Sequence, residues 1–183
     1  MAGNCIGLIE LGSIAAGFQA TDTMLKTAAV ELMVARSICS GKYMVMVRGD
    51  VAAVQSSVTA GEQAGDFAVI DTFVIPNVHE QIFPAIAGTT KVERMEALGI
   101  IESFSVASLI EGADAAVKAA NVTLIEIRLA MALGGKAFAT LTGDVAAVQA
   151  AVDAGAEVVA EKGLLVNRIV IPRPREELMS EMI

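Results

Sequence analysis

Short apolar runs alternate with segments of helical spacing along the first half of the chain. Residues 6–11 form an apolar run that ends at Gly12, which predicts a buried strand. Apolar residues near helical spacing follow over 13–28, and Ser13 stands where a helix cap is expected. A strand followed by a capped amphipathic helix is therefore the first predicted unit.

The pattern continues with a hairpin, a second helix and a last strand. Two apolar runs flank a short loop that contains Gly41, which is typical of a hairpin. Asp50 is placed to cap a second helix, and Gly61 predicts where that helix ends. The predicted elements are strands 32–37, 43–47 and 67–75, helix 50–61 and a short helix at 78–86. Their order, βαββαβ, is the ferredoxin-like arrangement, an α+β (α/β) fold with helices on one face of the sheet.

The whole pattern then occurs a second time. The segment from Gly7 to Glu10 (GLIE) returns as Gly99 to Glu102 (GIIE), and residues 49–55 return unchanged as 143–149. The second copy predicts strand 97–103, helix 105–119, hairpin 123–143, helix 144–155 and strand 163–171. The period far exceeds the roughly 20–50 residues of solenoid repeats. We therefore expect two tandem domains, 1–88 and 96–183, joined by a linker at 89–95.

Composition and charge argue against several classes of protein. Apolar residues make up 55% of the chain and the net charge is −8, which argues against a nucleic-acid partner. The longest stretches without a charged residue, Leu11–Thr21 and Val51–Gly61, are too short for a membrane span of about 20 residues. No basic segment precedes an apolar run near residue 1, so we expect no secretory signal and a cytoplasmic protein. The apolar excess is then buried within the fold or between subunits.

Residues that carry chemistry are scarce. His79 is the single histidine, and Cys5 and Cys39 are the two cysteines, with no C-x-x-C motif. Neither a P-loop nor a G-x-G-x-x-G motif occurs. We therefore expect no enzyme, two reduced thiols, a packing or surface role for Cys5 and an exposed surface role for His79.

Four motifs, in register in both copies, resemble the bacterial microcompartment shell domain. In the second copy they are residues 112–122, a glycine-containing hairpin, residues 143–148 and residues 170–174. They follow the family's order without circular permutation. Two fused copies resemble the trimeric, tandem-domain (T-type) class of these shell proteins. The resemblance implies a homotrimer that forms a pseudohexagonal tile and packs against neighbouring shell proteins around metabolic enzymes.

The resemblance also implies residues at the tile's centre and edge. The family's loop after the second strand faces the central axis, and here the two copies differ most at that loop. The implied tile-edge residues are Lys26, Lys118 and Arg173. The implied pore-lining residues are Ser37, Ile38, Lys42, Met131, Leu133 and Gly134.

A subset of tandem shell proteins carries an iron–sulfur cluster at this loop, with a pattern resembling I-C-P-G-K. This chain has Ile38-Cys39-Ser40-Gly41-Lys42, with serine in place of proline. Three thiolates around a threefold axis can hold three irons of a cube, and water or another ligand holds the fourth. The resemblance implies a [4Fe–4S] cluster per trimer with Cys39 as its metal ligand and Cys39, Ser40 and Gly41 as its binding residues. Electron transfer to an encapsulated or external redox partner, or cluster delivery, is the implied role.

Other interpretations of the same residues stay open. A lone cysteine is most often an inert, packed thiol, so Cys39 can be a pore-lining thiol of a tile that conducts a small metabolite. A ferredoxin-like regulatory or metabolite-binding oligomer unrelated to shells is the third hypothesis.

Overall fold

A computed structural model of the chain describes residues 4–92, 95–130 and 134–180. The first repeat forms the predicted succession of strands and helices. Its elements are β1 (Cys5–Leu11), α1 (Ile14–Thr27), β2 (Glu31–Ile38), β3 (Lys42–Gly49), α2 (Val51–Gly65), a 3₁₀ turn (Asp66–Ala68) and β4 (Val69–Ile75). The strands pair in the order β2-β3-β1-β4, and all neighbours are antiparallel.

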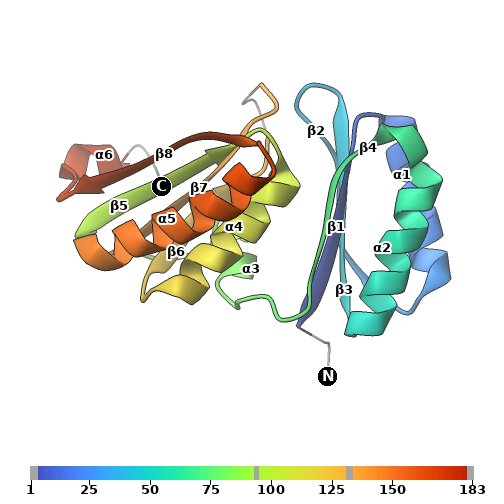
Figure 1. Cartoon of the computed structure of the whole chain (residues 1–183), viewed down its shortest axis with the longest axis horizontal. Coiled ribbons are helices and arrows are strands. Elements are labelled where there is room, and N and C mark those ends of the chain that lie inside the picture. Colours follow the sequence, from blue (N-terminus) through green and yellow to red (C-terminus); the bar gives the residue numbers. More distant parts are fainter. Residues whose placement is uncertain (1–3, 93–94, 131–133, 181–183) are drawn as a thin grey trace. The chain divides into compact units, whose positions relative to one another are not determined.

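The second repeat has the same topology. Its elements are β5 (Ala97–Ser103), α4 (Val106–Ala119), β6 (Thr123–Arg128), β7 (Ala137–Gly143), α5 (Val145–Glu161) and β8 (Leu165–Pro172). The strand order β6-β7-β5-β8 repeats that of the first sheet. In each sheet a helix pair covers one face, α1 with α2 and α4 with α5 (Figure 1). The predicted α+β fold of two tandem βαββαβ units is confirmed.

Two helices extend beyond the glycines at which the sequence predicted that they end. Helix α2 continues past Gly61 to Gly65, and α5 continues past Gly155 to Glu161. Both glycines lie at helix contacts: a Cβ on Gly61 would lie 2.6 Å from Met24 Cγ, and one on Gly155 would lie 2.5 Å from the Gly112 carbonyl oxygen. The predicted stop at Gly61 is therefore wrong, because this glycine allows close packing inside a helix.

Smaller differences concern the ends of elements. Strand β4 begins at Val69 because Asp66–Ala68 form the 3₁₀ turn. The short helix α3 spans Ile82–Ala87, and a helix α6 that the pattern did not predict spans Glu176–Ser180.

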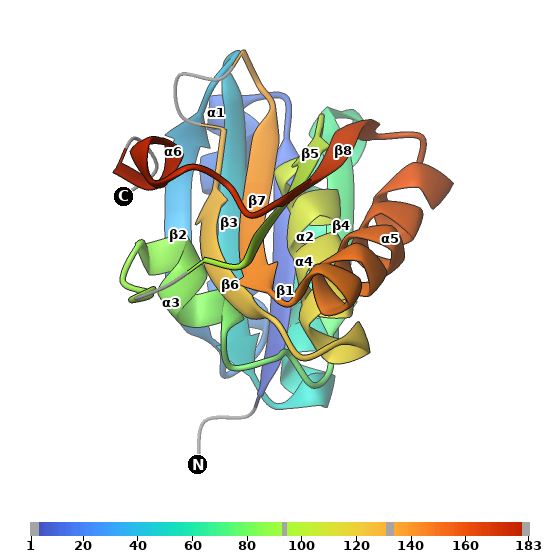
Figure 2. The same ribbon diagram turned by 90° about the vertical axis from the view of Figure 1, so that its left-hand side faces the viewer.

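The chain divides into two compact units whose limits differ from those of the repeats. The first unit consists of residues 1–78, 105–108 and 130–136, and the second of 79–104, 109–129 and 137–183. Helix α3 therefore belongs to the second unit, where it lies beside β6 (Figure 2). Gln81, just before α3, secures this contact: its side chain donates to the Val122 carbonyl at 3.1 Å and accepts from the Leu124 N–H at 2.7 Å.

The core of the first unit lies between its sheet and its two helices. All seven residues of the central strand β1 are buried, including the carboxylate of Glu10. Aliphatic side chains of both helices and of β3 pack against this strand; they include Met24, Val45, Val47, Val54 and Val58.

Candidate functional site

Cys39 lies at the tip of the hairpin between β2 and β3. The strands pair as far as Ile38 and Lys42, so Cys39, Ser40 and Gly41 form the turn. Ser40 has φ 62° and Gly41 has φ 75°. The left-handed conformation costs a non-glycine residue about 1–2 kcal/mol. Because proline is fixed near φ −65°, proline could not adopt the Ser40 conformation, and the turn differs here from the proline-containing pattern.

A loop from the second repeat contacts this turn inside the first compact unit. The Cys39 N–H donates to the Ala130 carbonyl at 2.8 Å. A Cβ on Gly135 would lie 2.8 Å from Ser40 Oγ, so only glycine fits this approach without a shift. The Cys39 turn therefore contacts Ala130 and Gly135, which belong to the second loop that the resemblance assigned to the same axis. The Cys39 N–H is already bonded within the chain, so it is not a ready donor to a cluster sulfide.

The predicted pore residues have different surroundings. Ser37 is exposed, whereas Ile38 is only 5% exposed. Lys42 Nζ forms an ion pair with Glu10 Oε1 at 2.8 Å, and 18% of the lysine side chain is accessible. Gly134 lies in the second loop at φ 61°. Met131 and Leu133 lie outside the described residues.

The partner of Lys42 is Glu10, the last residue of the segment that recurs as Gly99 to Glu102. Glu10 is fully buried, and its second oxygen accepts from Ser105 Oγ and from the Val106 N–H, each at 2.9 Å. The Val106 N–H belongs to the first turn of α4, where N–H groups have no partner within the helix. The Glu10 carboxylate thus neutralises Lys42 and stabilises the positive end of a helix.

Asp71 completes this group beside Glu10. The two residues are paired across β1 and β4. Asp71 Oδ2 accepts from Ser108 Oγ at 2.5 Å, and it lies 2.7 Å from Ser105 Oγ, whose single proton it shares with Glu10 Oε2. We call Glu10, Lys42 and Asp71 the carboxylate clamp. In the sequence, Glu10 stands within an apolar strand, and a glutamate recurs at the same place as Glu102. This pattern could have revealed the group, because a buried carboxylate almost always has a partner.

Acidic, cysteine and histidine side chains do not gather into a metal site within the described part of one chain. Among the described residues of one chain, no group of three His, Cys, Asp or Glu side chains is placed to hold a metal ion. Cys5 is 1% exposed in β1, and burial raises the pKa of its thiol above the usual value. Cys5 is therefore a packing thiol, and the half-buried Cys39 is the one that lies at a loop tip.

The predicted edge residues differ in their exposure and in their ion pairs. The Lys26 side chain is 74% exposed and pairs with Asp22 at 2.6 Å. Lys118 pairs with the buried Asp114, which also accepts the His79 N–H at 2.7 Å. Arg173 is exposed and has φ 49°. Lys26 and Lys118 occupy equivalent helix ends, but the ion pair of Lys118 is more buried.

His79 is half-buried rather than fully exposed. Its ring Nδ1 accepts from the Gln81 N–H at 3.4 Å, and its carbonyl accepts from the Ile82 N–H at 3.1 Å. These bonds place His79 at the start of α3 in a structural position.

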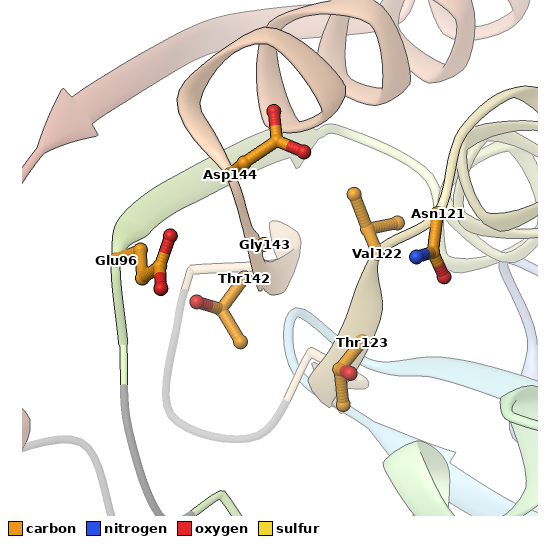
Figure 3. A pocket seen from close by; sticks show the side chains of 7 residues that line it. All are labelled: Glu96, Asn121, Val122, Thr123, Thr142, Gly143 and Asp144. Carbon is orange, nitrogen blue, oxygen red and sulfur yellow. The ribbon is translucent and has the colours of Figure 1, made fainter.

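A shallow pocket of about 310 Å³ lies where β5, β6, β7 and α5 begin or end (Figure 3). Its walls include Glu96, Asn121, Thr123, Thr142 and Asp144. The Asp144 carboxylate accepts the Ala147 N–H at 2.8 Å as the cap of α5. At the place of Thr123 and Thr142 the first repeat has Glu31 and Arg48, an ion pair at 2.8 Å. Shorter side chains in the second repeat thus open this pocket.

Comparison with known proteins identifies both repeats. The family profile of the BMC domain matches residues 5–78 and 97–174. The bacterial microcompartment shell protein PduT of Citrobacter freundii is 46% identical over 178 residues, which cover 97% of each chain. The shell protein EutM of Salmonella typhimurium is 49% identical over 84 residues, 46% of this chain and 85% of EutM.

Solved structures give the same result. A microcompartment protein from Desulfitobacterium hafniense has 52% identity and a TM-score of 0.86, and the match covers 96% of this chain and 98% of that one. A fused, permuted hexameric shell protein shares the fold at 21% identity and a TM-score of 0.62. Throughout the described ranges, every helix is too short or too polar to cross a lipid bilayer.

Proposed function

The chain belongs to the BMC-domain family of bacterial microcompartment shell proteins, and from this premise we propose that three copies form a shell tile with an iron–sulfur cluster on its threefold axis. Tandem BMC domains make it a shell protein whose place is the microcompartment shell. Its relatives are structural proteins, in agreement with the absence of an acid–base constellation in the sequence. The trimer, the cluster and a redox partner are the parts that we propose.

The position of Cys39 carries this proposal. The thiol lies at a hairpin tip whose backbone is held by the Ala130 carbonyl, so the turn has a defined place in the fold. Threefold symmetry would bring three such thiols together and supply what one chain lacks. When bound, a [4Fe–4S] cluster with three cysteine ligands provides one-electron redox chemistry.

This chain's own residues give such a site its shape. Glycines at 41, 134 and 135 carry no side chain, so the backbone at these positions can approach an axis closely. Lys42 lies directly after the turn, and its charge is balanced by Glu10. The three Cys39 side chains would bind three irons, and the fourth iron would take water or another ligand.

Anaerobic reconstitution with iron and sulfide tests the cluster. We expect about four irons and four sulfides per trimer in the wild type and an electron paramagnetic resonance signal after reduction or oxidation. Cys39→Ser should lose both, because the oxygen replaces the only thiol at the loop tip.

The matched control is Cys5→Ala, which removes the buried thiol of β1 and leaves the turn intact. It should keep the iron content and the spectrum of the wild type. A wild-type trimer that stays colourless and iron-free after reconstitution would exclude the cluster.

A conducting pore without a cluster is the second candidate. Apart from the adjoining residues, no described atom of the chain lies within 4 Å of the Cβ positions of Gly41 and Gly134, so space is open beside both loops. A structure of anaerobically purified trimer with an empty axial channel would support this candidate. Density bonded to three Cys39 sulfurs would rule it out.

The tile edge is the third part of the proposal. We expect Lys26→Ala with Lys118→Ala to leave trimers intact and to abolish sheets, because these side chains would pack against the neighbouring tile. Electron microscopy of purified protein measures the sheets, and sedimentation measures the trimer. Unchanged sheets would contradict the edge assignment.

A further inference from the structure

Left-handed residues gather in two loops of the first compact unit. Ser40 and Gly41 have φ 62° and 75°, and Ala130, Gly134 and Gly135 have φ 47°, 61° and 87°. Ser40 and Ala130 are not glycines, so their side chains make this conformation costly. Such strain persists only where the surrounding structure enforces it, and it is concentrated at functional sites.

The hairpins of the two repeats end differently although their strands are equivalent. In the first hairpin, β2 and β3 pair as far as Ile38 and Lys42. In the second, β6 and β7 pair only as far as Arg128 and Phe138. Ala130, the counterpart of Ile38, leaves the ladder at φ 47°. Its carbonyl is therefore available to a donor outside its own hairpin.

The second loop contacts the Cys39 turn through two residues. The Ala130 carbonyl accepts the Cys39 N–H at 2.8 Å, and Ala130 is fully buried. A Cβ on Gly135 would lie 2.8 Å from Ser40 Oγ and 3.8 Å from the Cys39 carbonyl oxygen. The N–H and the carbonyl of Cys39 therefore both lie beside the second loop.

The strand ends on either side of the turn are held by other parts of the unit. Lys42 forms its ion pair with Glu10 in the carboxylate clamp, and Ile38 is only 5% exposed. With both strand ends fixed, the place of the Cys39 thiol depends on how the turn between them is held.

We propose that Ala130 and Gly135 are the residues that position the Cys39 thiol. The inference deepens the proposed function, since it takes Cys39 as the cluster ligand and adds that the second repeat sets its place. Ala130 fixes the Cys39 backbone through the hydrogen bond, and Gly135 leaves room for Ser40. A shared metal site needs each ligand held within about half an ångström, which the two strand ends alone do not ensure.

Gly135→Ala tests this role in the full-length chain, in a Cys5→Ala background that leaves one thiol. The added Cβ would meet Ser40 Oγ and shift the turn away from the Ala130 carbonyl. The matched control is Gly134→Ala, which also places alanine at a left-handed position. Apart from the adjoining residues, no described atom lies within 4 Å of the Cβ that this control adds.

Two measurements, made before iron and sulfide are added, follow the turn directly. Exchange of the Cys39 amide hydrogen reports its bond to Ala130, and alkylation of the thiol by iodoacetamide reports how often the turn opens. We expect both rates to rise about fivefold in Gly135→Ala, the factor that loss of one hydrogen bond gives. Both should keep the parent's values in Gly134→Ala.

A second variant separates a shifted turn from a damaged fold. Ser40→Gly removes the hydroxyl that the new Cβ would meet, and glycine adopts φ 62° without strain. Added to Gly135→Ala, it should return both rates towards those of the parent. Damage elsewhere in the fold would leave both rates high, which would contradict the inference.

Iron uptake separates the inference from the proposed function. After reconstitution, Gly135→Ala should bind less iron than its parent. If the parent binds about four irons per trimer and the two glycine variants show equal exchange and alkylation, the inference is overturned and the proposed function stands. If the parent binds no iron, the proposed function fails, and a rise of both rates in Gly135→Ala alone still supports the positioning of the thiol.

Discussion

At the residue scale, Glu10 carries two tasks that are normally separate. Its carboxylate balances Lys42 and accepts the first N–H groups of α4, so both oxygens are used. A buried carboxylate is stable only with such partners, because desolvation of an unpaired charge costs several kcal/mol. Glu10 is therefore a structural charge.

We expect Lys42→Met to lower the free energy of unfolding by about 3 kcal/mol, because it leaves the buried Glu10 without its cation. Urea or guanidinium unfolding measures the change. The matched control, Lys26→Met, breaks the exposed pair with Asp22 and should cost about 0.5 kcal/mol or less. Equal losses in the two variants would show that the burial of Glu10 does not matter.

Cys5 gives a prediction for alkaline pH. Burial raises the pKa of its thiol in the folded state, so the unfolded chain releases this proton first as the pH rises. The stability that a neutral Cys5 contributes is complete below the ordinary thiol pKa of about 8.5 and is lost above it. Between pH 7 and pH 10, under reducing conditions, the wild type should lose more unfolding free energy than Cys5→Ala. Parallel losses would contradict this.

Sequence alone could locate Cys39 but not the partners of Glu10. The cysteine stands in a local pattern between two strand signals, and a turn is decided within a few residues. The hydroxyl and N–H groups that Glu10 binds lie about a hundred positions later in the chain. No local pattern specifies such a contact, although the recurrence of glutamate in an apolar strand marks the position.

At the element scale, a glycine in a helical pattern can end the helix or allow close packing inside it, and the sequence does not distinguish these two roles. Gly61 and Gly155 both resemble helix stops, yet α2 and α5 continue through them. Each allows a neighbouring helix to approach. Strand order and helix placement follow from the βαββαβ pattern, whereas a helix end inside an apolar stretch depends on packing.

Substitution of the two glycines by alanine should lower the free energy of unfolding by different amounts. A Cβ on Gly155 would overlap the backbone carbonyl of Gly112, whereas one on Gly61 would meet only side-chain atoms, of Ile9 and Met24. We expect Gly155→Ala to cost about 2–3 kcal/mol and Gly61→Ala about 1 kcal/mol or less, since alanine also favours the helix. Denaturant unfolding of the two variants measures the difference, and a larger loss for Gly61→Ala would refute it.

At the scale of the whole molecule, the two repeats are alike in sequence and unlike in burial. The sequence predicted the duplication because identical segments recur in order. It did not predict that 105–108 would be buried while 13–16 stay exposed, because both segments read as the same capped helix start. Exposure depends on neighbours in space, and the repeat pattern carries no information about them.

The duplication has a genetic consequence at the hairpin tips. In a chain with one repeat, a single codon change would alter that loop in every domain of an assembly. Here the Cys39 turn and the loop with Gly134 and Gly135 are encoded separately, so a change in one leaves the other as it was. The two loops are separate inherited traits. One can acquire a reactive side chain while the other stays small enough to leave it room.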